Sequence, residues 1–513
     1  MNMNVTVTVP SRRVPAWHAW CIEALRREPL LTVRVVALGG PDAPVARGPF
    51  APLTSTVLAP VDVALDAGGL GEPDLIVDLT GAAQPASAPH GVWSFRLDES
   101  DDADVPFAGE IAAGRRTVRT ILVRRLGGSV ECLRAGRFPV QRWYPSTVKL
   151  ALRETARWPA TLAAVLASGV ALTAEPVPIA SSPSRDGAMG RVRFGASLAR
   201  RLAGALRTAL FEVDQWNVGF VEGGPRRLLS SEPLEVRWLP TPAPLTYIAD
   251  PFVAERDGVR ALFVETYDYF GRRGAIDALV LDDADRVVRR ERVLGGPTHL
   301  SYPYPFEIDG ELYLIPESAE ANEVALYRCE HFPDRWVRES AIFPAFDGVD
   351  TTLFAHEGRW WAFCTRYSRG STLALHAFHA GSPRGPWTAH ALNPIVVDVS
   401  SARPAGQPFV VDGALYRPAQ DCSDSYGGGL AIARIDELTP VSYRETIVQR
   451  HDARTFGRWN GGIHTVSFTR GRIVVDGKHV YRDLRKLPAA VTKGVRLARR
   501  VLRRPPAKEA TFA

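Results

Sequence analysis

The C-terminal half of the chain repeats one pattern five times, and this repeat constrains the fold more than any other feature of the sequence. Each copy is an alternating apolar strand, a tight turn ending in glycine and a second alternating strand. The copies are DPFVAERDGVRALFVE (250–265), YPYPFEIDGELYLIPE (302–317), DTTLFAHEGRWWAFCT (350–365), AGQPFVVDGALYRPAQ (405–420) and IHTVSFTRGRIVVDGK (463–478). Their turn glycines, at intervals of 48 to 58 residues, are Gly258, Gly310, Gly358, Gly413 and Gly471. That interval suits one four-stranded blade, so the repeat predicts an all-β five-bladed β-propeller over residues 238–483.

Two positions of the repeat carry polar residues where the strands should end near the propeller axis. Eight residues before the turn glycine stand Asp250, Tyr302, Asp350, Ala405 and Ile463. Seven residues after it stand Glu265, Glu317, Thr365, Gln420 and Lys478. The start of one strand and the end of its antiparallel neighbour lie at the same end of a hairpin, so the two columns should converge near one opening. Burying carboxylates without partners is costly, and the columns therefore predict a functional cluster instead of a dry core.

Further polar residues stand close to these columns in the sequence. They are His299, Arg403, Gln407, Arg417, Asp421, His464 and Asp476. The arginine fork binds a carboxylate or a phosphate bidentately, which suits a charged substrate. Single acids in propellers also tie neighbouring blades together, so that role stays open for individual members. His464 and Asp476 could ligate a metal, but their spacing is not diagnostic, and the sequence assigns no metal and no cofactor.

The N-terminal half predicts an α/β domain over residues 1–170, with a Rossmann-type sheet. The strand-like runs are 5–10, 31–38 and 73–80, and a helical stretch at 14–27 separates the first two. This strand–helix–strand order favours a parallel sheet. Alternating runs on both sides of Gly127-Gly128 predict a hairpin. Residues 171–237 are expected to form a helical linker and a connecting strand.

The five cysteines are scattered without a CxxC pair, which fits a reducing compartment. The chain starts without an apolar signal segment and contains no membrane-length apolar run, so we expect a cytoplasmic protein. In the tail at 484–513, apolar residues recur every three to four positions among arginines and lysines. This pattern predicts a basic amphipathic helix that lies on an anionic membrane at its inner face, or that docks on its own protein. No recognition motif accompanies the charge, so nucleic acid is not an expected partner.

The runs PDLIVDLTG, GVWSFRLDES, VPFAGEI and RTILVRRLGGSVECLRAGRF resemble the formyltransferase fold, in the segment where such enzymes carry their catalytic groups. The family's chemistry uses an Asn-x-His motif and a distant Asp with formyl-tetrahydrofolate. Here HGVWS (90–94) stands at the matching place, and Asp98, Asp101 and Asp102 lie in an acidic run typical of an exposed loop. The resemblance therefore implies a formyltransferase-like domain that has lost formyl transfer.

Residues 238–483 closely resemble the propeller domain of plant glucosamine inositolphosphorylceramide transferases and of bacterial relatives. The motifs that carry this resemblance are WLPTP, ADPF, HLSYPYPFEIDGELYLIPES, DTTLF, GRWWAF, ARPAG, YRPAQD and IHT. The region is similar, more remotely, to five-bladed arabinanases and xylosidases, which use an Asp of the first blade as base, an Asp of the second as orienting group and a Glu of the third as acid. Asp250 matches the first of these by position. Glu317 falls on the second repeat and Asp350 on the third, so the order of the other two differs.

The leading interpretation is glycosyl transfer in surface-glycan or glycolipid biosynthesis, on a nucleotide- or lipid-linked sugar or glycan. Asp250 would be the base or nucleophile, and Glu317 or Asp350 the acid or the group that stabilises an oxocarbenium-like state. The substrate-binding residues would be Glu265, His299, Tyr302, Arg403, Arg417, Gln420, Asp421 and His464. Three alternatives stay open: a glycoside hydrolase with the same carboxylates, a non-catalytic sugar-binding scaffold, and a sugar N-formyltransferase.

Overall fold

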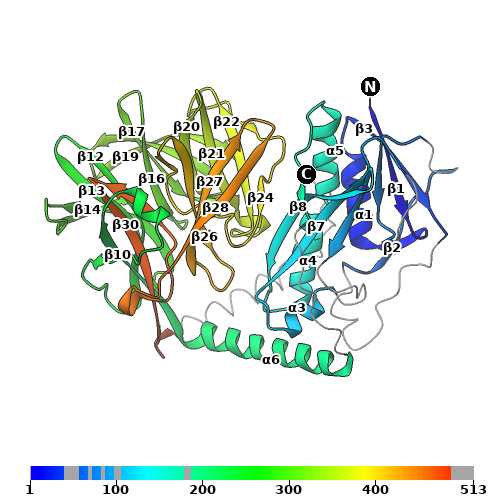
Figure 1. Cartoon of the computed structure of the whole chain (residues 1–513). Helices are drawn as coiled ribbons and strands as arrows, with labels where there is room; N and C mark the ends of the chain where they lie inside the picture. Colours follow the sequence, from blue (N-terminus) through cyan, green and yellow to red (C-terminus); the bar gives the residue numbers. More distant parts are fainter. Residues whose placement is uncertain are drawn as a thin grey trace. The chain divides into compact units, whose positions relative to one another are not determined.

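The computed structural model describes residues 2–39, 57–67, 72–81, 87–97, 106–177 and 187–486 (Figure 1). The chain divides into two units. The first unit comprises Met1–Arg201, Val349–Gly427 and Ala431–Val448, and the second unit comprises Leu202–Gly348, Gly428–Leu430 and Gln449–Ala513. The N-terminal domain and the third and fourth repeats therefore belong mainly to the first unit, and the other three repeats to the second.

A seven-stranded mixed sheet organises the N-terminal part of the first unit, in the order β3-β1-β5-β6-β7-β8-β9. The parallel strands are β1 (Met3–Val9), β3 (Leu31–Ala37), β5 (Leu75–Asp78) and β6 (Val92–Leu97). The antiparallel strands are β7 (Thr117–Leu126), β8 (Ser129–Pro139) and β9 (Glu175–Pro176). The turn between β7 and β8 uses Gly127 and Gly128 at φ 57° and 85°, as the hairpin pattern predicts. An α/β domain is thus present, and its formyltransferase likeness stays an interpretation.

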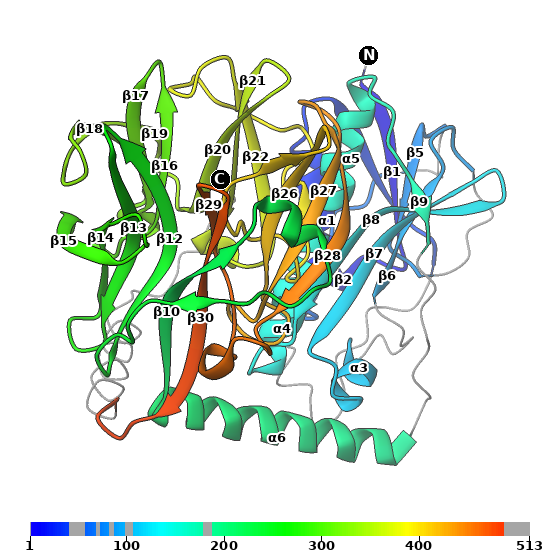
Figure 2. The ribbon, with the colours of Figure 1, turned by 60° about the vertical axis from the view of Figure 1, so that its left-hand side comes forward.

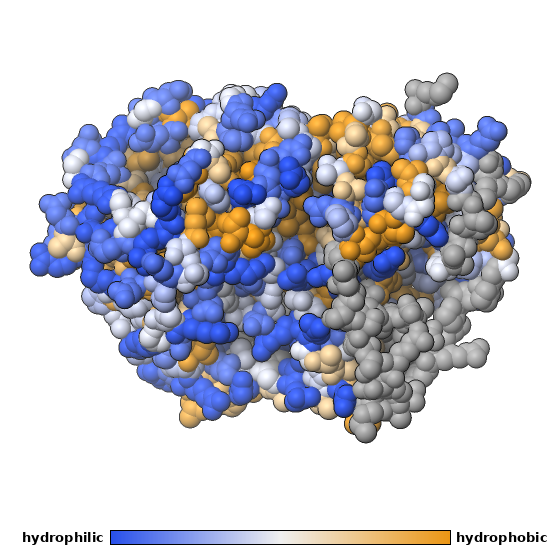
Figure 3. Space-filling model, in the orientation of Figure 1, coloured by the Kyte–Doolittle hydropathy of each residue, from blue (hydrophilic) through white to orange (hydrophobic). Residues whose placement is uncertain are grey.

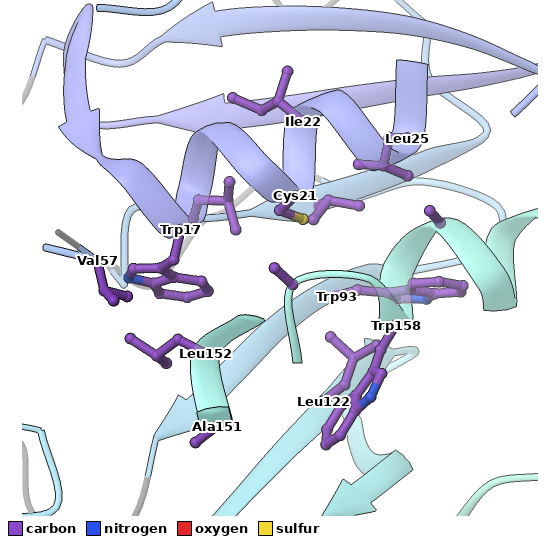
Figure 4. Close-up of a cluster of buried hydrophobic side chains, with 14 of the residues drawn as sticks. Trp17, Cys21, Ile22, Leu25, Val57, Trp93, Leu122, Ala151, Leu152 and Trp158 are labelled. Atoms are coloured by element: carbon purple, nitrogen blue, oxygen red, sulfur yellow. The ribbon is translucent and has the colours of Figure 1, made fainter. Parts of the chain in front are cut away.

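Helix α1 (Ala16–Arg26) connects β1 to β3 and presents an apolar stripe to the sheet. Trp17, Cys21 and Leu25 recur at four-residue steps, so they share one face of the helix and are buried together (Figure 4). The same core includes Trp93 of the sheet and Trp158. The other helices of this part are α3 (Ala108–Ala112), α4 (Tyr144–Thr155) and α5 (Trp158–Ala167), and β2 (Arg13–Pro15) pairs with β4 (Pro60–Asp62).

The third and fourth repeats form two antiparallel sheets. The third contains β20 (Gly348–His356), β21 (Arg359–Arg366), β22 (Ala374–Ala380), β23 (Thr388–Ala389) and β24 (Val396–Val397), and the fourth contains β25 (Phe409–Val411), β26 (Ala414–Asp421), β27 (Gly429–Leu438) and β28 (Tyr443–Asp452). Ala374 and Val397 of the third repeat are buried in the same core as the N-terminal sheet. Arg137 of β8 also lies 3.7 Å from the Asp398 carboxylate. The third repeat therefore packs directly on the N-terminal domain.

The first and second repeats are four-stranded antiparallel sheets of the second unit. Their strands are β12 (Thr246–Arg256), β13 (Val259–Asp268), β14 (Arg273–Leu281) and β15 (Val287–Leu294), then β16 (Ser301–Ile308), β17 (Glu311–Glu317), β18 (Glu323–His331) and β19 (Arg335–Pro344). Each sheet follows chain order, which is the meander of a propeller blade. The predicted five-bladed β-propeller is confirmed as a fold class.

The fifth sheet combines strands from both ends of the propeller region, in the order β11-β10-β30-β29 (Figure 2). β29 (Val466–Thr469) and β30 (Arg472–Arg482) come from the last repeat, whereas β10 (Glu212–Glu222) and β11 (Arg237–Trp238) precede the first. β10 pairs with β30 over eleven residues, from Glu212 to Glu222. β10 is therefore a strand of the fifth sheet and not only a connection, so this sheet includes residues that precede the expected boundary at Trp238. In the sequence, β10 follows directly after helix α6 (Gly187–Phe211).

All five hairpin turns of the repeat have the same backbone. Each turn places two consecutive residues at positive φ, and the second is always the glycine found in the sequence. The pairs are Asp257-Gly258, Asp309-Gly310, Glu357-Gly358, Asp412-Gly413 and Arg470-Gly471. Two successive positive φ angles define the type I′ turn, whose twist matches that of the flanking strands.

The blade surface at the left of the view in Figure 3 is mainly hydrophilic. Strand β15, the outer strand of the first blade, has the largely exposed sequence VVRRERVL. Among the described residues, no helix has the length and apolar character needed to cross a membrane. The predicted amphipathic tail lies outside the described residues from Leu487 onward, as does the acidic run at 98–105.

Candidate functional site

The first polar column occupies a strained backbone position in three blades. Asp250, Tyr302 and Asp350 have φ angles of 51°, 46° and 51°. The register of β12 with β13 shifts at Asp250, and that of β16 with β17 shifts at Tyr302, so both residues lie in β-bulges. Positive φ costs a non-glycine residue about 1–3 kcal/mol and is concentrated at functional sites. A bulge also re-aims a side chain, which explains why these positions break the alternation of their strands.

In the second unit, Asp250, His464 and Asp476 form a buried cluster. His464 Nδ1 lies 2.5 Å from Asp476 Oδ2, and His464 Nε2 lies 3.5 Å from Asp250 Oδ1. The imidazole is thus between two carboxylates. Asp250 is the most exposed of the three at 5%, against 2% and 0% for the other two. Because Asp250 alone retains measurable exposure among the carboxylates, it is the acid of this cluster that a substrate could reach.

Asp476 is the anchor of this cluster. Its carboxylate accepts backbone N–H groups from Asp250, His464 and Thr465, at 3.2, 2.9 and 3.1 Å. Hydrogen bonds to backbone donors stabilise a carboxylate and fix its position. Asp476 therefore holds together the start of the first repeat and the start of the fifth, within one unit.

Asp250 is oriented by neutral donors. The Thr465 hydroxyl donates to Asp250 Oδ1 at 2.7 Å, and the Tyr302 N–H donates to Oδ2 at 3.1 Å. The His464 ring is stacked on Trp216 of β10, with centroids 4.0 Å apart and planes inclined by 17°. Sequence reasoning missed both Thr465 and Trp216. Thr465 follows a predicted residue, but Trp216 lies outside the repeat and carries no local signal.

The same cluster offers three ligand atoms to a cation. One atom each from Asp250, His464 and Asp476 lies within 4.8 Å of the others. Carboxylate oxygen and imidazole nitrogen are common ligands of divalent cations. These residues could hold such an ion, and the short Nδ1–Oδ2 contact equally suits an imidazole that bridges two acids.

A second group in the same unit surrounds Glu265, which is buried at the end of β13. His299 Nε2 lies 3.5 Å from Glu265 Oε1, and the Tyr247 hydroxyl donates to the same oxygen at 3.3 Å. His299 Nδ1 accepts the Gly274 N–H at 2.8 Å, so a neutral ring carries its proton on Nε2, toward Glu265. The structure therefore brings together two residues, Glu265 and His299, that were predicted separately.

Glu317, predicted as an acid, is half-buried at the end of β17. The Ser301 hydroxyl donates to Glu317 Oε2 at 3.0 Å. Ser301 and Glu317 are directly paired across β16 and β17, one residue before the bulge at Tyr302. The second repeat thus places its two polar columns at the same end of one hairpin, as the spacing predicts.

In the first unit, Asp350 is held by a charged donor as well as by a neutral one. Arg403 donates to both carboxylate oxygens, with Nε 2.7 Å from Oδ2 and Nη2 3.1 Å from Oδ1. Gln420 Nε2 donates to Oδ2 at 2.9 Å. The Arg403 guanidinium also lies over the Tyr426 ring, 5.0 Å from its centroid. Asp350, Arg403 and Gln420 are all buried, so this predicted group is a desolvated, charge-balanced pair.

Arg417, predicted to bind substrate, is engaged inside the fourth repeat. Its guanidinium donates to both oxygens of Glu445, at 2.6 and 2.7 Å, and to the Ser401 carbonyl at 2.7 Å. Burial opposes its charge, but Glu445 and Tyr443 outweigh that effect and raise the pKa of Arg417. Arg417 is therefore a permanent cation whose partner is a carboxylate of its own blade. Asp421 Oδ1 accepts the backbone N–H of Ser423 at 3.0 Å.

The structure thus brings the predicted residues together in separate groups, each within one unit. The convergence of all of them on one opening stays a prediction. A cleft of about 420 Å³ in the second unit contains none of them and is lined by Trp238, Phe456 and Trp459 among others. The indole of Trp238 lies over Gly219 and Gly477, where a methyl group would collide with it.

Comparison with known proteins finds relatives of the propeller. Residues 239–468 match the family described as glucosamine inositolphosphorylceramide transferase 1, N-terminal. Over these residues the propeller is similar to that of the glucosamine inositolphosphorylceramide transferases. The chain is 34% identical over 227 residues to the transferase 1 proteins of Oryza sativa subsp. japonica and Arabidopsis thaliana. The match covers 42% of this chain but only 30% of either relative, so the chain spans less than a third of the transferases that it matches.

Among solved structures, the propeller is similar to the GH43_1 enzyme from Xanthomonas citri in complex with xylotriose. The sequence identity is 13%, the match covers 45% of this chain and 82% of that enzyme, and the TM-score is 0.34. At this level the similarity carries no argument about chemistry.

Proposed function

We propose that this protein acts on carbohydrates and transfers a glycosyl group in surface-glycan or glycolipid biosynthesis. The cluster of Asp250, His464 and Asp476 carries the proposal. The Asp250 carboxylate and the adjacent His464 imidazole supply a base and a proton-exchanging partner, and Glu317 supplies the second carboxyl group that acid–base catalysis at a glycosidic bond requires. The named activity of the relatives, transfer involving glucosamine and inositolphosphorylceramide, supports a lipid-linked or glycan acceptor as the substrate class. The donor sugar is proposed to be nucleotide- or lipid-linked.

In this mechanism Asp250 is the base that takes a proton from the acceptor hydroxyl. His464 lies next to Asp250 and can exchange that proton, while Asp476 fixes the ring from its other side. Glu317 is the acid that protonates the leaving group, oriented by Ser301. The bidentate contact with Arg403 favours a charge-balancing role for Asp350 over proton transfer.

The second candidate is a sugar-binding propeller without chemistry of its own. It is favoured by the extent of the match, which covers 30% of the relatives and corresponds to an N-terminal family region. The transfer reaction of those relatives could therefore be carried by their unmatched part. In that case the same residues would hold a glycan for a partner enzyme.

Formyl transfer is the weaker alternative. His90, which stands where the formyltransferase motif would be, is tied to the backbone through its N–H to the Asp74 carbonyl at 2.9 Å. Its carbonyl accepts the Trp93 indole N–H at 3.1 Å. The nearby acids Asp98, Asp101 and Asp102 lie outside the described residues. Product formation from formyl-tetrahydrofolate and an amino sugar would overturn this judgement.

We propose that the protein is located at the cytoplasmic face of a membrane, to which the basic tail at 484–513 binds. Removal of these residues should move the protein from the membrane to the soluble fraction. An unchanged distribution would contradict this proposal.

The decisive experiment compares Asp250→Asn with Asp257→Asn. Asp257 is an exposed turn residue with a φ of 52°, close to the 51° of Asp250, so it is a matched control. Loss of a general base should lower turnover by about 10²–10⁴-fold in Asp250→Asn only. Turnover is followed with nucleotide sugars and lipid-linked acceptors, with free sugar release as the readout for hydrolysis. Full activity of Asp250→Asn would refute the mechanism, and sugar binding without any reaction would support the scaffold.

A further inference from the structure

A strip of three tyrosines extends from Glu265 along the end of the first blade. We call Tyr247, Tyr267 and Tyr269 the tyrosine strip. Tyr247 and Tyr267 are directly paired across β12 and β13, and their rings are stacked with centroids 4.9 Å apart and planes inclined by 10°. The Tyr269 ring meets both of them edge-on, at 6.2 and 5.3 Å. On a strand, residues two apart share a face, so Tyr267 lies beside Glu265.

Two of the three hydroxyls in the strip are engaged, and the third is not. Tyr247 donates to Glu265, and the Tyr269 hydroxyl donates to the Asp214 carbonyl at 2.9 Å. Within the described ranges the Tyr267 hydroxyl has no hydrogen-bond partner. Its ring is half-buried and also contacts His299, with centroids 6.2 Å apart. Tyr267 is therefore a fixed ring with an available hydroxyl.

The backbone at Gly274 packs so closely against Glu265 and His299 that no side chain fits there. Gly274 is paired with Tyr267 across β13 and β14. A Cβ at this position would lie 2.6 Å from Glu265 Oε1 and 2.6 Å from His299 Cε1. Only glycine permits this close approach, so the backbone is adapted to the pair that adjoins the tyrosine strip.

We propose that the tyrosine strip is a stacking subsite for a neutral sugar ring, next to a ring held by Glu265 and His299. This inference rests on the proposed carbohydrate function and deepens it. The C–H faces of a pyranose are apolar and pack on aromatic rings, while the Tyr267 hydroxyl and the Glu265 carboxylate serve the sugar hydroxyls. Burial and the negative charge of Glu265 raise the pKa of Tyr267, so its hydroxyl keeps its proton and can donate. The strip would therefore make the protein prefer two linked sugars over one.

The test measures calorimetric binding of N-acetylglucosamine and of its β-1,4-linked disaccharide, both of which are uncharged. Tyr267→Leu keeps apolar volume but removes the aromatic face, and Tyr267→Phe keeps the face but removes the hydroxyl. Phe270→Ala is the matched control, because Phe270 is a neighbouring aromatic residue that is 64% exposed. The wild-type protein should bind the disaccharide roughly 5- to 10-fold more tightly than the monosaccharide. Tyr267→Leu should abolish that gain, Tyr267→Phe should lose about half of it, and Phe270→Ala should lose none.

The other possible results distinguish the subsite from the proposed function. A disaccharide preference that survives in Tyr267→Leu refutes the subsite and leaves the proposed function standing. A preference that depends on Tyr267, in a protein whose Asp250→Asn variant turns over normally, supports the subsite and refutes the proposed mechanism. Binding of neither sugar by the folded wild-type protein refutes both proposals for this sugar class. Melting curves establish that each variant is folded.

Discussion

Asp250 and Asp350 occupy the same position of the repeat in different units, with the same φ of 51°, but their partners differ. Asp250 is held by a hydroxyl and a backbone N–H and lies near an imidazole. Asp350 is clamped by the guanidinium of Arg403. A carboxylate beside a titratable ring can exchange a proton, whereas one in a bidentate ion pair mainly balances charge. The repeat therefore supplies one backbone geometry, and neighbours from outside the aligned columns decide what each acid can do.

The largest expected effect is a difference in stability between the Asp350 and Asp250 variants. Asp350→Asn should lower the free energy of unfolding of the first unit by about 3–5 kcal/mol, because Arg403 is left buried without its counter-charge. Asp250→Asn should cost only about 1 kcal/mol, since its direct donors are neutral. Urea unfolding monitored by fluorescence gives both values.

A matched variant tests the assignment to the ion pair. Replacing both members, Asp350→Leu with Arg403→Met, should recover much of the loss seen in Asp350→Asn. Equal destabilisation by Asp250→Asn and Asp350→Asn would remove the distinction between the two acids.

Much of the propeller can be predicted from residues that are close together in the sequence. Each turn glycine is the second residue of a type I′ turn, and the alternation around it fixes two strands, so residues near Gly258 or Gly471 predict their own hairpin. β10 could not be found in this way. Arg472 and Glu222 lie side by side but are 250 residues apart in the sequence, and no local signal connects them. The closing strands of the fifth blade therefore need the structure.

The same distinction, between residues that the repeat predicts and residues that it does not, applies to the candidate site. Asp250 and Glu265 are fixed by the spacing of the repeat and His464 stands next to one of its positions, so all three were predicted. Trp216 comes from β10 and was missed for the same reason as that strand. The arginines show a different limit, because sequence predicts that Arg417 needs an anion but not whether that anion is a substrate or Glu445.

A smaller effect is expected at Gly274. A methyl group there collides with Glu265 and His299, and overpacking of this kind costs about 1–3 kcal/mol. Gly271→Ala is the control, because its Cβ would contact nothing closer than 3.7 Å. Melting temperature and sugar binding should fall in Gly274→Ala only. Parallel losses in both variants would mean that the second unit is sensitive to glycine replacement in general.

The smallest effects come from the neutral donor of each acid. Thr465→Val removes the hydroxyl that donates to Asp250, and Gln420→Met removes the amide that donates to Asp350. Each variant should lose about 1 kcal/mol of stability, since one hydrogen bond to a carboxylate is removed while others stay.

The two variants should differ in turnover. Thr465→Val frees Asp250 to rotate and should lower it roughly fivefold at constant substrate affinity, whereas Gln420→Met should leave turnover per folded molecule unchanged because Arg403 still fixes Asp350. If the two variants lose turnover equally, Asp350 takes part in the chemistry, and the contrast between the two acids lies in their stability alone.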